Sequence, residues 1–144
     1  LIRKRLENRG FHVVTANRGE KALELAKTKR IDVALVDLKM PGMDGEQTLE
    51  ALKDQHKWME IIILTGHGSI DSAISSIKKG AYNYLQKPCE LETLIDALSQ
   101  AYRKSVSNKM QIEEKKMNEL LEGASHSPLA ILEKLRQIDR DKKS

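Results

Sequence analysis

Residues 33–45 read VALVDLKMPGMDG, an apolar run that ends at the carboxylate of Asp37 and continues into a turn rich in proline and glycine. The same arrangement recurs twice downstream, where Thr65 and Lys87 each follow an apolar run of strand length. Short apolar runs bounded by turn residues are typical of buried strands. The sequence therefore predicts three strands that end in an acid, a hydroxyl and an amine.

Strands and helices are predicted to alternate along the chain. Apolar runs predict strands at residues 11–14, 33–36, 60–65 and 82–86. Helical spacing and capping residues predict helices before Gly10, over residues 20–29 and 45–55, from the N-cap Ser69 to Gly80, from about Glu90 onward, and after Ser127-Pro128. Continuously apolar strands that alternate with helices favour a parallel sheet covered on both faces. The strands of such a sheet end at one edge, so Asp37, Thr65 and Lys87 are expected to converge there.

Length and composition allow one domain with an appendage. Among the 144 residues, no apolar run approaches the roughly 20 residues that span a bilayer, so no membrane segment is predicted. The single cysteine, Cys89, cannot form an internal disulfide, which favours a cytoplasmic location. The net charge of +4 is spread among interspersed acids and bases, with only five aromatic residues, so direct nucleic-acid contact is not expected.

The last forty residues differ in character from the rest. Residues 105–144 are rich in charge, with apolar residues at irregular helical spacing, and Pro128 is placed to open a separate helix. We predict a main domain over residues 1–104 and a helical linker or dimerisation tail over residues 105–144.

The chemistry that best uses an acid, a hydroxyl and an amine at one edge is phosphoryl transfer onto the acid. An ionised aspartate is a known covalent nucleophile for phosphate, which makes Asp37 the candidate acceptor. Lys87 would neutralise the phosphoryl oxygens and Thr65 would donate a hydrogen bond to them. The backbone amide after Thr65 could also bind them, because Gly66 permits close approach. A lone aspartate after a strand is more often a turn former, and the joint placement decides against that reading.

At these residues the sequence resembles the receiver domain of two-component response regulators. The matching segments, in order, are Asp37 with residues 40–45, Thr65-Gly66, and residues 80–88. The resemblance covers roughly residues 1–102 and is nearest to receivers of enhancer-binding transcription activators. It implies a doubly wound, flavodoxin-like α/β sheet, with the family's first strand and the acidic pair after it lying outside this sequence.

The resemblance also implies roles for individual residues. Asp37 would take a phosphoryl group from a sensor histidine kinase, Thr65 and Lys87 would sense it, and Tyr84 would be the switch aromatic. Mg²⁺ would be held by Asp37 and the backbone carbonyl of Lys39, with the remaining acidic ligands absent from this sequence. The Lys87-Pro88 peptide would be cis.

The function expected from these features is that of a signalling receiver, which acts by contact and is not an enzyme beyond self-phosphotransfer and autodephosphorylation. Its output would go to an effector domain or protein, or to a second copy paired through the last receiver helix and the tail. Two alternatives stay open. One is a receiver-like scaffold that dimerises independently of phosphorylation. The other is a phosphatase with an aspartyl intermediate, for which Asp44 is the available second acid.

Overall fold

The computed structural model describes residues 2–39, 42–66, 69–123 and 128–143. Leu1, placed by sequence in the first helix, and Ser127, predicted as an N-cap, lie outside these ranges, as do Met40 and Pro41 of the turn motif. The chain divides into two compact units, Leu1–Ser107 and Asn108–Ser144.

The first unit is built on a parallel sheet of three strands in the order β1-β2-β3. The strands are β1 (Val33–Val36), β2 (Glu60–Thr65) and β3 (Asn83–Gln86). All six residues of β2 are buried, as expected for the central strand of a sheet covered on both faces. The predicted α/β class with a parallel sheet is confirmed.

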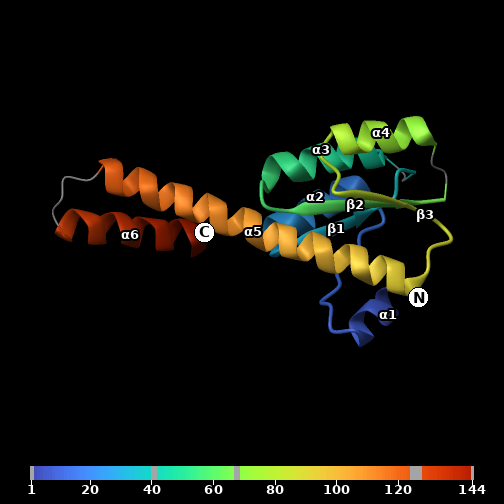
Figure 1. The fold of residues 1–144 in the computed structure, drawn as a ribbon, viewed down its shortest axis with the longest axis horizontal. Helices are drawn as coiled ribbons and strands as arrows, with labels where there is room; N and C mark the ends of the chain where they lie inside the picture. Colours follow the sequence, from blue (N-terminus) through green and yellow to red (C-terminus); the bar gives the residue numbers. More distant parts are fainter. Residues whose placement is uncertain (1, 40–41, 67–68, 124–127, 144) are drawn as a thin grey trace. The chain divides into compact units, whose positions relative to one another are not determined.

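Helices cover both faces of this sheet. The described helices are α1 (Ile2–Asn8), α2 (Gly19–Thr28), α3 (Gly45–Gln55), α4 (Ile70–Lys78), α5 (Leu91–Gly123) and α6 (Pro128–Lys143). Of these, α1 to α4 and the first part of α5 belong to the unit that holds the sheet, and α6 belongs to the other unit. Figure 1 shows α2, α3 and α4 on one face of the sheet, with α1 and the first part of α5 on the other. Alternate residues of β2 point to opposite faces of the sheet. Ile61 and Ile63 pack with α2 and α3, whereas Ile62 and Leu64 pack with α1 and α5. This division of side chains makes the fold doubly wound.

The strand predicted at residues 11–14 is wrong. The described chain has no strand there, and β1 pairs only with β2. A strand needs a hydrogen-bonded neighbour, and no described segment supplies one on the outer side of β1. Phe11 and Val13 nevertheless pack, partly buried, against the core layer of α1 and α5, whereas Val14 is 42% exposed.

Helix ends follow local sequence signals. Asp44 caps α3 through a capping box with Gln47, and Ser69 caps α4 through one with Ser72. Helix α6 begins at Pro128, which confirms the predicted proline at a first helical position. The helix predicted from about Glu90 onward is also confirmed, because α5 begins at Leu91 and is 33 residues long. No helix in the described ranges is long and apolar enough to cross a bilayer.

Candidate functional site

The three residues predicted to converge do lie together at the carboxyl edge of the sheet. Lys87 Nζ lies 3.3 Å from Asp37 Oδ2, and the Thr65 hydroxyl donates a hydrogen bond to the same carboxylate. Thr65 is fully buried as the last residue of β2, whereas the Asp37 and Lys87 side chains are 33% and 46% exposed. A fixed hydroxyl and a solvent-accessible ion pair therefore share one site.

The site favours the ionised form of Asp37. Burial alone would raise the pKa of Asp37, but three groups together outweigh it and lower the pKa. These groups are the Lys39 backbone amide, which donates to Oδ1 over 3.1 Å, the Thr65 hydroxyl and the Lys87 ammonium. Asp37 is therefore a carboxylate at neutral pH, the form that can act as a nucleophile.

The turn after Asp37 returns the chain tightly to the end of β1. The Gly45 amide donates to the Leu38 carbonyl over 3.1 Å. A Cβ placed on Gly45 would lie 2.4 Å from the carbonyl oxygen of Asp37, so only glycine fits this first position of α3. The Asp44 cap then fixes where the helix starts, because its side chain accepts the Gln47 amide over 2.8 Å. Gly45 is thus required by close packing against the end of β1, and Asp44 by the capping of α3.

Tyr84 is half-buried in β3, and its hydroxyl is 3.2 Å from the Ser72 hydroxyl. Ser72 Oγ also accepts the Ser69 amide over 2.9 Å, so one side chain joins Tyr84 to the cap of α4. Sequence analysis named Ser69 and Tyr84 but missed Ser72. The spacing of Ser69 and Ser72 is a sequence signal for the capping box. No local sequence signal indicates that Ser72 contacts Tyr84.

The remaining predicted positions frame the site. Gly66 is exposed directly after Thr65, and a Cβ added there would meet only Lys87 Cβ, at 4.0 Å. The Lys87-Pro88 peptide is cis, as the resemblance implied. The side chain of Asp44, the candidate second acid, accepts the Gln47 amide as the cap of α3. The position of Asp44 therefore does not support the phosphatase alternative.

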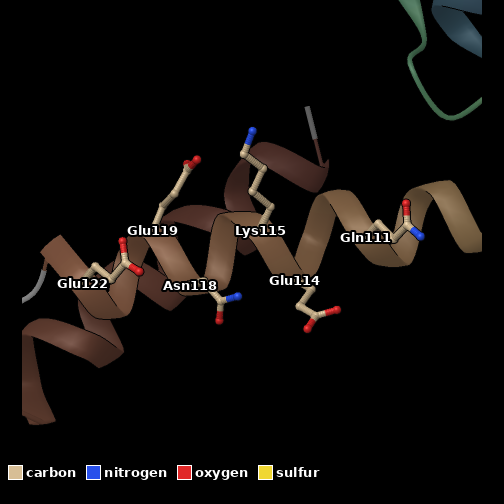
Figure 2. Close-up of a pocket in the computed structure, with 6 residues that line it drawn as sticks. All are labelled: Gln111, Glu114, Lys115, Asn118, Glu119 and Glu122. Atoms are coloured by element: carbon tan, nitrogen blue, oxygen red, sulfur yellow. The ribbon is translucent and has the colours of Figure 1, made fainter.

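The second unit has a surface hollow, but its polar groups are not arranged as a binding site. The hollow, of about 470 Å³, is lined by residues of α5: Gln111, Glu114, Lys115, Asn118, Glu119 and Glu122. Figure 2 shows Lys115 and Glu119 on one side of the helix and Glu114 and Asn118 on the other, so these groups do not converge on a common point. The chemistry-bearing cluster is the one around Asp37.

Comparison with known proteins identifies the class. The family described as the response regulator receiver domain matches residues 1–99. The chain therefore belongs to the receiver-domain family of two-component response regulators. Such domains are regulatory and typically not enzymes.

Two relatives show the subgroup within that family. The DNA-binding transcriptional regulator NtrC of Klebsiella pneumoniae is 34% identical over 101 residues, which cover 70% of this chain and 22% of NtrC. The alginate biosynthesis transcriptional regulatory protein AlgB of Pseudomonas putida is 33% identical over 137 residues, covering 92% of this chain and 31% of AlgB. The chain thus spans about a fifth to a third of the length of these relatives.

Solved structures agree with the sequence comparisons. NtrX from Brucella abortus superposes with a TM-score of 0.72 at 26% identity, over 96% of this chain and 30% of NtrX. The beryllofluoride-activated NtrC4 receiver domain dimer superposes with a TM-score of 0.68 at 33% identity, over 72% of this chain and 86% of that chain. These matches confirm the fold and the NtrC-like subgroup.

Receiver domains generally bind Mg²⁺, an ion with strict ligand requirements. Octahedral Mg²⁺ takes about six oxygen ligands at near-ideal geometry. Within the described ranges, no three or more His, Cys, Asp or Glu side chains are grouped so that they could hold a metal. Asp37 and the Lys39 carbonyl therefore do not form a Mg²⁺ site by themselves.

Proposed function

We propose that this receiver accepts a phosphoryl group on Asp37 from a sensor histidine kinase and thereby switches its contacts with a partner. The observation that carries the proposal is the ionised Asp37 held between the Lys87 ammonium and the Thr65 hydroxyl. In the transfer, a carboxylate oxygen of Asp37 bonds to phosphorus while the phosphorus–nitrogen bond of the kinase phosphohistidine breaks. The histidine nitrogen keeps that electron pair, so atoms and charges balance.

Each neighbour of Asp37 has a task in this reaction. The Lys87 ammonium can exchange its carboxylate partner for a phosphoryl oxygen, which neutralises charge that accumulates during transfer. The Thr65 hydroxyl can donate to a second phosphoryl oxygen. The Gly66 amide lies directly after Thr65, where absence of a side chain leaves room for a third contact. These roles rest on the geometry at Asp37 and on family membership.

The switch would run through Tyr84 to α4. Thr65 is paired in register with Gln86 of β3, two residues after Tyr84, and the Tyr84 hydroxyl is 3.2 Å from Ser72 Oγ in the capping box of α4. A displacement of Thr65 would reach Tyr84 through this pair of strands. Helix α4 also carries three exposed isoleucines, Ile70, Ile74 and Ile77, which are 80%, 49% and 48% exposed. An exposed apolar stripe of this kind is a plausible contact surface for a protein partner. The cap of α4 therefore links the acceptor site to a partner surface.

The output side of the proposal concerns residues 105–144. Continuous helix α5 extends past residue 104 to Gly123, and α6 follows, so the predicted linker or dimerisation tail is helical. The similar proteins NtrC and AlgB are transcriptional regulators, and NtrC4 is named as a receiver dimer. We accordingly propose an effector domain or a second copy as partner, a cytoplasmic location, and no direct contact of this chain with nucleic acid.

The experiment is phosphorylation of the native protein that carries this chain. It is incubated with acetyl phosphate and Mg²⁺, and its intact mass is measured. We expect a gain of one phosphoryl group that is lost in Asp37→Ala and kept in Asp54→Ala, since the side chain of Asp54 is 84% exposed in an exposed ion pair. Absence of any gain, or a gain that survives Asp37→Ala, would refute the proposal. The first result would leave the phosphorylation-independent scaffold as the better explanation.

A further inference from the structure

The first turn of α2 lies directly against the turn that follows Asp37. Glu20 Oε1 accepts the backbone amide of Met43 over 2.9 Å. A Cβ placed on Gly42 would lie 2.8 to 2.9 Å from the two carboxylate oxygens of Glu20 and from a nitrogen of Arg18. Gly19 is constrained as well, because a Cβ there would lie 2.3 Å from Thr48 Oγ1 and 3.1 Å from Met43 Cβ. The two turns therefore approach each other closely at two glycines, and the φ of +77° at Gly42 also favours glycine there.

Glu20 is held in its charged form at this contact. Its own backbone amide, the Met43 amide and the Arg18 guanidinium lower the pKa of Glu20 and outweigh the effect of burial. Arg18 Nε lies 3.7 Å from the second carboxylate oxygen. Hydrogen bonds that a charged group accepts are about twice as strong as neutral ones. The bond to Met43 is thus stronger than an ordinary contact between a loop and a side chain.

The Met43 amide, which Glu20 binds, is connected to Asp37 by a short series of contacts. Met43 precedes the cap residue Asp44 and then Gly45, whose amide is bonded to Leu38. Gly45 also approaches the Asp37 carbonyl so closely that no side chain fits between them. Fixing Met43 therefore fixes the start of α3 against the end of β1, where the acceptor side chain begins.

We infer that Glu20 is a positioning residue for the Asp37 site, which holds the turn at Met43 and so sets the orientation of the acceptor carboxylate. Glu20 is 17 positions before Asp37 and is not placed to touch the phosphoryl group through any contact described above. Its effect would pass through the backbone of the turn. The inference rests on the proposed function for its consequence in phosphorylation, but the hold on Met43 can be measured independently.

The test compares Glu20→Ala and Glu20→Gln with Glu24→Ala in the native protein. Glu24 is an exposed glutamate one turn further along α2, so its removal controls for loss of charge on this helix. Three quantities are measured: amide hydrogen exchange at Met43, the ¹³C carboxyl signal of Asp37, and the rate of phosphorylation by acetyl phosphate with Mg²⁺.

We expect faster Met43 exchange, a shifted Asp37 signal and a phosphorylation rate about 3- to 10-fold lower in Glu20→Ala. Glu20→Gln keeps an oxygen acceptor for the Met43 amide and should recover part of the rate, whereas Glu24→Ala should resemble the unmodified protein. A general loss of stability would not be partly reversed by Glu20→Gln, and it would not be confined to the Met43 exchange and the Asp37 signal.

Unchanged Met43 exchange or an unchanged Asp37 signal in Glu20→Ala would overturn the inference. So would a phosphorylation rate equal to that of Glu24→Ala. If the unmodified protein gains no phosphoryl group, the proposed function fails, and the two spectroscopic readouts then decide alone whether Glu20 positions the carboxylate.

Discussion

Replacing Gly45 by alanine would test how tightly α3 is packed on the end of β1. The added Cβ would lie 2.4 Å from the Asp37 carbonyl oxygen and 2.5 Å from Leu38 Cα. Both are backbone atoms, and carbon contacts are normally about 3.5–4.0 Å, so the helix must move by about 1 Å. Overpacking of this kind costs about 1–3 kcal/mol. The better helix propensity of alanine offsets at most about 1 kcal/mol, so a cost in the middle of that range, about 2 kcal/mol, leaves a net loss of about 1–2 kcal/mol.

Urea unfolding followed by Trp58 fluorescence measures this loss. Trp58 is the chain's one tryptophan and belongs to the unit Leu1–Ser107, so its signal reports the receiver and not the tail. With a urea dependence of about 2 kcal/mol per molar, the midpoint should fall by roughly 0.5–1 M. The stability control is Gly66→Ala, whose Cβ would meet only Lys87 Cβ at 4.0 Å. Its midpoint should change little, by the equivalent of about 0.5 kcal/mol or less.

Equal midpoints for the Gly45 and Gly66 variants would refute the close-packing argument. The displacement should also reach the acceptor, because Gly45 presses on the backbone of Asp37 itself. We therefore expect slower phosphorylation of Gly45→Ala by acetyl phosphate under conditions where the variant remains folded. A folded variant with unchanged rate would show that the start of α3 does not control the carboxylate, and it would weaken the role inferred for Glu20 as well.

Two further predictions concern ion pairs. The folded-state pKa of Asp37 is depressed, so its contribution to stability is present above the unfolded pKa of about 3.9 and lost as pH falls through the folded value. Lys87→Met should raise the pKa of Asp37 in a ¹³C titration and cost about 0.5–1 kcal/mol at neutral pH, since the pair is partly exposed; an unchanged titration would contradict this. Lys53 bonds the buried Glu60 over 2.7 Å, so Lys53→Met should cost about 1–3 kcal/mol in urea unfolding, because the buried carboxylate loses this partner. The exposed Lys57→Met should cost less than about 0.5 kcal/mol, and equal costs would show that the burial of Glu60 does not matter.

The elements that sequence predicted with the right bounds carry their own start and stop signals. Helix α3 covers the predicted residues 45–55, because Asp44 is a cap that needs only the three residues after it. Strand β2 covers the predicted residues 60–65, because burial on both faces makes the apolar run continuous. Local chemistry decides such elements, so a single sequence is enough to find them.

Features that depend on another part of the chain were missed or misjudged. The apolar run at residues 11–14 predicts a strand, but a strand also requires an edge to pair with. The isoleucines of α4 form a helical stripe, and the stripe is exposed while Ser76 on the same helix is fully buried. Periodicity shows that apolar residues share a face, and it does not say what covers that face.

Some residues of the candidate site can be predicted from the sequence, and others depend on how the helices pack. The convergence of Asp37, Thr65 and Lys87 followed from one rule, that parallel strands end at a common edge. Glu20 and Ser72 followed from no such rule, because each reaches the site from a helix whose approach is set by packing. Side chains that support a site from a neighbouring element are therefore the ones that sequence reasoning is least able to find.

Under the proposed function, one set of contacts holds the backbone near Asp37 in place and another responds to the phosphoryl group. Glu20 acts on the backbone of the turn through a charged bond to Met43, which phosphorylation of Asp37 does not consume. Thr65 acts on the carboxylate itself, and a phosphoryl group would compete directly for that hydroxyl. Because the side chain of Thr65 is fully buried, its movement must be matched by a neighbour. The turn can thus stay fixed while the hydroxyl moves, and a signal can leave the site without disturbing the geometry that receives it.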